Sequence, residues 1–76
     1  MAYALAEEPI DMAQRHVLQT ERLVARQRAL VERLRSGGHI ELIPQARALL
    51  INLRTSVIVA RKDLARLLAI SSAALR

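Results

Sequence analysis

Apolar side chains recur at alternating spacings of three and four residues along two long stretches of this chain. In the first stretch the recurring positions are Val17, Thr20, Val24, Gln27, Val31 and Leu34. In the second they are Leu50, Leu53, Val57, Ala60, Leu64 and Leu67. This heptad spacing places each set along one stripe of an α-helix, and such stripes pair with one another. We therefore predict an all-α fold, an antiparallel two-helix coiled-coil hairpin that is broken at Ser36-Gly37-Gly38-His39.

The expected divisions of the chain follow from its helix start and stop signals. Pro9 suits a first helical turn, but Asp11, with a glutamine three residues later, resembles a capping box, so two start points remain open. Gly37 or Gly38 is expected to adopt the left-handed conformation that closes the first helix, and Pro44 fits the first turn of the second. The predicted divisions are a flexible N-terminus at 1–8, a hairpin at 9–70 with helices at about 10–36 and 43–70 and a loop at about 37–42, and a C-terminal tail at 71–76.

The two flanks of the predicted seam differ in chemistry. With Val17 and Leu50 at heptad position a, antiparallel pairing brings position e against e and position g against g. The g flank is partly apolar and includes Leu23, Leu30 and Leu49. The e flank, called the arginine flank below, includes Arg28, Arg35, Arg47, Arg54 and Arg61.

The second helix carries more apolar surface than one partner helix covers, because Ile51 and Ile58 add to its seam residues. A two-helix hairpin has a single internal seam, and small chains without other staples often oligomerise. We therefore expect a homodimer, a four-helix bundle in which a second hairpin buries Leu23, Leu30, Leu49, Ile51 and Ile58.

Composition adds several expectations about the class of protein. The 76 residues allow one domain, the sequence has no cysteine, and Tyr3 is its only aromatic residue. The first residues lack the basic and apolar regions of a signal peptide, and polar residues interrupt the apolar runs of the second helix. We therefore expect a cytoplasmic protein with no membrane span.

The formal charge of +5 makes nucleic acid, anionic lipid or an acidic partner worth considering for the arginine flank. The alternative is a solvated helix face whose arginines are satisfied by Glu21, Glu32, Asp63 and water. The sequence shows no aromatic residues for base stacking beyond Tyr3 and no helix-turn-helix pattern, so nucleic acid is the less favoured partner.

Catalytic and metal-binding patterns are weak in this sequence. His16 and His39 are far apart along the hairpin without the ligand spacing of a metal site, and His39 is expected to cap a helix end. The carboxylates are scattered singly, and the glycine pair lacks the context of a phosphate loop. We expect no enzyme activity, no metal and no cofactor. Gln27, a polar seam residue, is either a specificity element or a residue that fixes the helix alignment.

Several segments carry a resemblance, among them Arg15-His16-Val17, Val24-Ala25-Arg26-Gln27, Ala29-Leu30-Val31, Gly38-His39 and Ala48-Leu49-Leu50. With them the chain resembles a group of uncharacterised short helical-hairpin proteins of alphaproteobacteria. The resemblance covers about residues 14–68 and implies a hairpin fold and a bacterial origin, but no activity. This chain has Ile40-Glu41 where the group has Asp-Thr, a good start for a helix.

Two functions are compatible with these patterns. The leading hypothesis is a small helical protein-protein interaction or self-association module without catalytic activity. Its partner would be a second copy of the chain or an unidentified protein. The alternative is a non-specific nucleic-acid or anionic-surface binder that uses the arginine flank, with strongly salt-dependent binding.

Overall fold

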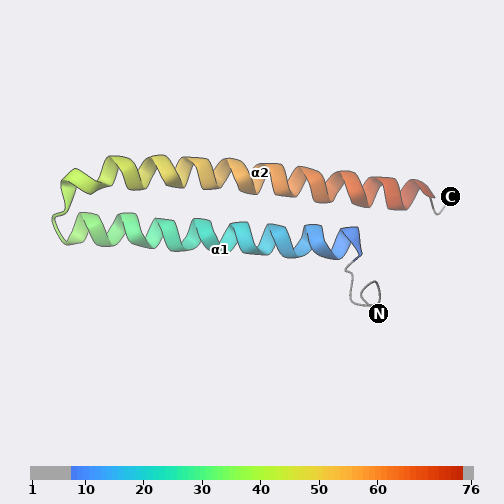
Figure 1. Ribbon diagram of the computed structural model, residues 1–76, viewed down its shortest axis with the longest axis horizontal. Helices are drawn as coiled ribbons and strands as arrows, with labels where there is room; N and C mark the ends of the chain where they lie inside the picture. The colour runs from blue at the N-terminus through green and yellow to red at the C-terminus, as the bar shows by residue number, and fades with distance from the viewer. Residues whose placement is uncertain (1–7, 75–76) are drawn as a thin grey trace, which may run out of the picture.

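The computed structural model describes residues 8–74, and within this range the chain is an all-helical antiparallel hairpin without strands (Figure 1). Helix α1 spans Pro9–Ser36, the short 3-10 helix η2 spans Ile40–Leu42, and helix α2 spans Ile43–Ala74. The two long helices lie side by side along the length of α1, and η2 follows the turn that joins them. The predicted all-α hairpin is confirmed.

The ends of the helices differ slightly from the expected ones. Helix α1 begins one residue before the expected position 10 and ends at Ser36, as predicted. Helix α2 begins at Ile43 but continues through both serines to Ala74, four residues beyond the expected end. Ser71 is half-buried, because this part of α2 lies against the start of α1. The expectations for residues 1–7 and 75–76 lie outside the described residues.

Of the two possible starts of α1, the structure uses the one at Pro9. Glu8 is the extended N-cap residue, with ψ of 146°, and its side chain makes no capping hydrogen bond. Proline suits the first helical position, since its missing N–H needs no partner there. Asp11 lies within the first turn, where its negative charge is favourable near the positive end of the helix dipole.

The turn between the helices has the hydrogen bonds of a Schellman motif. The N–H of His39 donates to the carbonyl of Leu34 at 2.9 Å, and that of Gly38 donates to the carbonyl of Arg35 at 3.2 Å. Gly38 has φ of +76°, the left-handed conformation that the sequence predicts for one of the two glycines.

Helix α2 starts without a side-chain cap. The carbonyl of His39 accepts a hydrogen bond from the N–H of Leu42 at 3.1 Å, which closes η2. The side chain of His39 makes no capping hydrogen bond, so the expectation that His39 caps a helix end is wrong. Pro44 lies in the first turn of α2, as expected. A single 3-10 turn therefore leads into α2, at the place where the resembling proteins have Asp-Thr.

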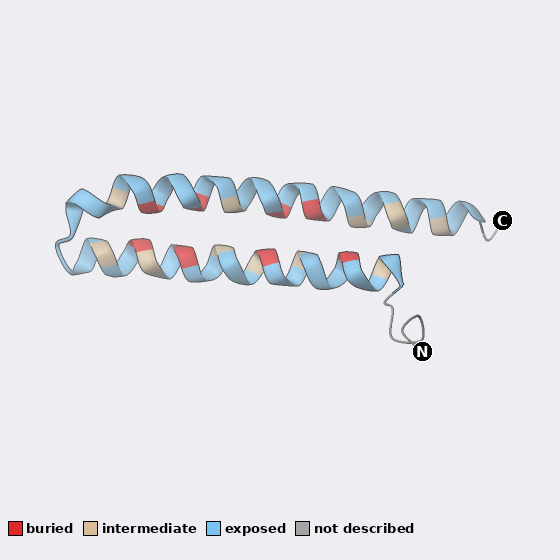
Figure 2. Ribbon diagram, viewed as in Figure 1, coloured by how far each residue is buried: buried red, intermediate tan, exposed pale blue. Residues whose placement is uncertain are grey.

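The buried residues lie on the facing sides of α1 and α2 (Figure 2). All twelve predicted seam residues are buried or half-buried, and Ala13 and Ala46 extend the buried seam toward the start of each helix. None of the described side chains is completely enclosed, however. The hairpin thus has a thin core, one layer of mostly aliphatic side chains between two helices.

The two polar seam residues are both satisfied by hydrogen bonds. Thr20 Oγ1 lies 3.0 Å from the carbonyl oxygens of His16 and Val17, in its own helix. Gln27 Nε2 instead donates across the seam to the carbonyl of Ala46 at 2.8 Å. This hydrogen bond joins α1 to α2 at one relative position, which supports the interpretation of Gln27 as a residue that fixes helix alignment.

Candidate functional site

The arginine flank is built where position e of α1 meets position e of α2. Arg61 Nη2 lies 2.7 Å from Glu21 Oε2, an ion pair that joins the two helices. Arg35 Nη1 lies 3.4 Å from Glu32 Oε2 within α1. Both pairs are largely exposed to solvent, so each contributes little to stability.

The other three arginines of the flank, Arg28, Arg47 and Arg54, form no ion pair with any described residue. The solvated-face interpretation assigns Glu21, Glu32 and Asp63 to the arginines of this flank. Glu21 and Glu32 do pair with members of the flank, but they neutralise only two of its five arginines. Asp63 pairs with Arg66 within α2 and not with an arginine of the flank. The arrangement leaves uncompensated positive charge on one edge of the hairpin.

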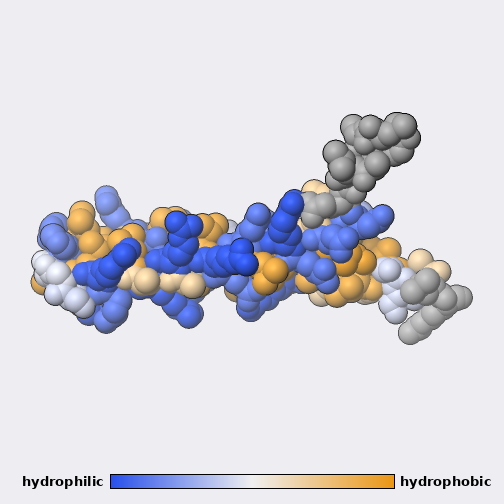
Figure 3. All heavy atoms as spheres, turned by 90° about the horizontal axis from the view of Figure 1, so that it is seen from below, coloured by the Kyte–Doolittle hydropathy of each residue, from blue (hydrophilic) through white to orange (hydrophobic). Residues whose placement is uncertain are grey.

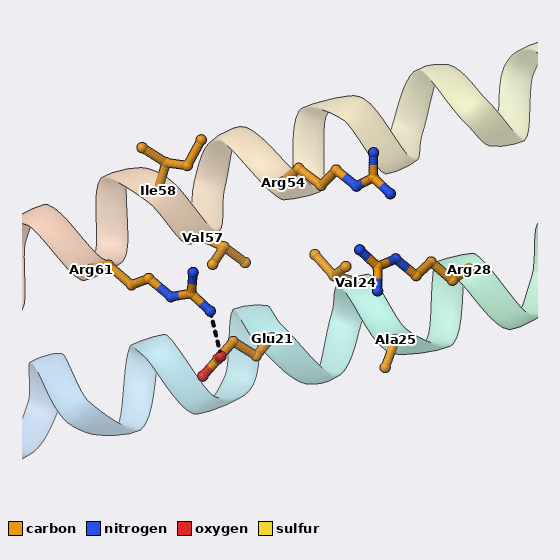
Figure 4. A pocket seen from close by; sticks show the side chains of 8 residues that line it. All are labelled: Glu21, Val24, Ala25, Arg28, Arg54, Val57, Ile58 and Arg61. Atoms are coloured by element: carbon orange, nitrogen blue, oxygen red, sulfur yellow. Dashed lines mark hydrogen bonds and ion pairs between the residues drawn. The ribbon is translucent and has the colours of Figure 1, made fainter.

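A groove runs between the helices on this flank (Figure 4). It is lined by Glu21, Val24, Ala25, Arg28, Arg54, Val57, Ile58 and Arg61. The side chains of Arg28 and Arg54 come from opposite helices, and their guanidinium groups reach toward the same part of the groove beside Val24. The groove thus combines an aliphatic floor, formed by Val24 and Val57, with two arginines that have no ion pair to any residue in the range 8–74.

The five residues expected at a dimer interface lie on two different flanks. Leu23 and Leu49, which are 43% and 48% exposed, occupy g positions together with the half-buried Leu30. Ile58, which is 52% exposed, lines the groove between Arg54 and Arg61. Ile51 precedes it by one heptad and follows the same side of α2, so both isoleucines belong to the arginine flank. The sequence-based grouping combined two surfaces that the hairpin separates.

The outer face of α1 is hydrophilic. Figure 3, which views the hairpin from the side of α1, shows hydrophilic side chains along much of this face, with apolar side chains between them and near the end that carries the chain termini. Arg22 and Arg26 are among the exposed residues of this helix. Apolar residues are not absent from this face, because Met12 near the start of α1 is 51% exposed.

A second groove lies at the open end of the hairpin, lined by Glu8, Pro9, Ile10, Asp11, Leu67, Ile70 and Ser71. Sequence reasoning missed this groove, because it ended the second helix at residue 70. The signal that points to it is Ser71, which continues the heptad stripe of Leu64 and Leu67. Its lining residues show that the end of α2 lies beside the start of α1, which accounts for the continuation of α2 past the expected end.

Metal-binding side chains do not gather in the part of the chain that the structure describes. No group of three or more histidine, aspartate or glutamate side chains is placed to hold an ion there. His16 and His39 are both exposed, the first on α1 and the second in the turn.

One stretch, Ile40–Ala74, is long and apolar enough to pass as a membrane span by length and composition. Only 17% of its most apolar window is buried in the hairpin. Core helices of soluble proteins pass the same test, so this single helix is weak evidence. The absence of a membrane span and the cytoplasmic location stay predictions.

Comparisons with protein-family models, curated proteins and solved structures gave no match. The resemblance to alphaproteobacterial helical-hairpin proteins therefore stays a prediction, and the function rests on the geometry alone.

Proposed function

We propose that this protein is a self-association module, a hairpin that dimerises through its g flank into a four-helix bundle. The observation that carries the proposal is the exposure of Leu23 and Leu49 on this flank, next to the half-buried Leu30. A hairpin with one thin seam gains most from a second layer of aliphatic contacts, because apolar burial is the main favourable term in folding and association.

The charges favour the g flank over the arginine flank as the dimer interface. Two copies meeting through their arginine flanks would bring Arg28, Arg47 and Arg54 against like charges, which opposes association. On the g flank, Asp63 carries a negative charge and is already paired with Arg66. Dimerisation through this flank leaves the arginines at the solvent edge of the bundle.

The proposal is tested by comparing two double variants by size-exclusion chromatography with light scattering. Leu23→Gln with Leu49→Gln places amides on the g flank and should convert the dimer into a monomer. The matched control is Ala29→Gln with Ala48→Gln, which adds the same groups at exposed positions away from both flanks. Equal masses for the two double variants, with helical circular dichroism retained, would rule out the g flank as the interface.

A second candidate function is binding of nucleic acid or another anionic surface. It is favoured by Arg28, Arg47 and Arg54, which have no ion pair with a described residue. Fluorescence anisotropy with labelled duplex DNA at low and physiological salt tests it. Salt-sensitive binding that Arg54→Glu with Arg61→Glu removes would support this function, and no binding at low salt would exclude it.

A further inference from the structure

The groove on the arginine flank carries an imbalance of charge at its centre. Three guanidinium groups and one carboxylate line it, which leaves a formal charge of +2. The carboxylate of Glu21 neutralises the charge of Arg61 through the 2.7 Å ion pair between the helices. The remaining positive charge belongs to Arg28 and Arg54, neither of which has an ionic partner among the described residues.

The heptad repeat explains how these two arginines come to face each other. Arg28 lies one heptad after Glu21 on α1, and Arg54 lies one heptad before Arg61 on α2. In an antiparallel hairpin, a step toward the C-terminus of α1 and a step toward the N-terminus of α2 both lead toward the turn. Arg28 therefore lies opposite Arg54, just as Glu21 lies opposite Arg61. Figure 4 shows both guanidinium groups directed into the groove beside Val24. The position that would supply a carboxylate is therefore occupied by a second cation.

We propose that Arg28 and Arg54 bind the phosphate group of a soluble phosphate monoester. A doubly charged phosphate matches the formal charge of +2, and guanidinium groups bind its oxygens through paired hydrogen bonds. The aliphatic floor formed by Val24 and Val57, with Ile58 at its rim, offers a contact surface for the organic part of the ester. This site is separate from the g flank, so it does not depend on dimerisation.

The same groove disfavours a continuous chain of phosphates. One heptad from Arg28, Glu21 and Arg61 neutralise each other in their ion pair, so a nucleic-acid backbone extending in that direction would meet no net positive charge. Arg35, on the other side of Arg28, is paired with Glu32. A single phosphate between Arg28 and Arg54 avoids both carboxylates.

The site is tested by recording the arginine Nε–H signals of the ¹⁵N-labelled full chain by NMR while inorganic phosphate is added at constant ionic strength. The signals of Arg28 and Arg54 should shift in a saturable way, while those of Arg26 and Arg33, on the opposite side of α1, should not. Arg28→Gln should abolish the shift at Arg54, and Arg54→Gln should abolish the shift at Arg28. Arg26→Gln is the matched control and should leave both shifts intact.

Two further titrations identify the ligand class. Phenyl phosphate should bind more tightly than inorganic phosphate in the wild-type chain, because its ring contacts the aliphatic floor. Binding should weaken at pH 5, where a phosphate monoester loses its second charge. Small, equal shifts of all arginine signals would overturn the proposal, and so would binding to phosphatidic-acid vesicles without any response to either soluble phosphate.

Discussion

At the scale of single residues, Gln27 is a buried polar side chain that we expect to fix the alignment of the two helices at some cost in stability. Its amide is buried and donates to the carbonyl of Ala46, on the other helix, at 2.8 Å. A hydrogen bond between a side chain and one backbone position favours a single offset between the helices, whereas aliphatic contacts allow several.

Gln27→Leu should therefore raise the free energy of unfolding, by about 1 kcal/mol, because a buried amide is replaced by an apolar side chain. It should also produce additional oligomeric species in sedimentation velocity, since the alignment is less specified. Gln19→Leu, at an exposed position of the same helix, is the control and should change stability by less than about 0.5 kcal/mol in urea unfolding. A fall in stability for Gln27→Leu would contradict this role of Gln27.

A single substitution at Arg28 would remove the excess positive charge of the groove. Arg28→Glu places a carboxylate opposite Arg54, as Glu21 lies opposite Arg61. We expect the free energy of unfolding to rise by about 0.5 kcal/mol at low salt, the size of an exposed ion pair, and the gain to shrink as salt is added. Arg26→Glu makes the same change in net charge away from the groove. An equal gain from Arg26→Glu would show that only net charge matters.

At the scale of elements, the turn decides whether two helices form a hairpin or one continuous helix. Gly38 has φ of +76°, and a Cβ atom there would meet no atom within 4 Å beyond those of its chain neighbours, so only the backbone conformation requires glycine. The Schellman hydrogen bonds of Gly38 and His39 depend on that conformation.

Gly38→Ala should lower the free energy of unfolding by about 1 kcal/mol, because an alanine in the left-handed region is strained. Gly38→Asn should cost less, since asparagine tolerates this conformation better than alanine. Thermal unfolding followed by circular dichroism measures both changes. Equal stability of the alanine variant and the wild type would mean that the turn does not constrain the helix pair.

Sequence spacing was sufficient for the parts of the fold that depend on local periodicity. The seam from Val17 to Leu67 follows from residues three and four apart, and the glycine pair marks the turn. The end of α2 was missed, because serine weakens a helix locally while Ser71 packs near the start of α1. Contacts with residues distant in sequence decide such ends.

The candidate site was predictable only in part, for the same reason. Heptad labels place the five arginines on one flank, but the division between paired and unpaired members depends on where each side chain meets its neighbour across the seam. The pairing of Arg61 with Glu21 spans 40 residues of sequence. The labels also place Ile51 and Ile58 beside the arginines when position b is followed around the helix, a step that the grouping of apolar residues overlooked.

At the scale of the whole molecule, the hairpin separates two surfaces with different chemistry. The g flank presents the exposed Leu23 and Leu49, which would be buried against a second copy in the proposed dimer. The arginine flank presents Arg28 and Arg54, to which we assign the proposed phosphate site. Because the two flanks lie on opposite sides of the seam, a dimer formed through the first leaves the second accessible.

Sedimentation equilibrium of the wild-type chain at several micromolar concentrations tests the central claim, self-association, most directly. The chain has a mass of 8.5 kDa, and the account predicts a fitted mass of twice that value with no trend toward larger assemblies. A fitted mass equal to that of one chain, at concentrations where the protein is helical, would contradict it.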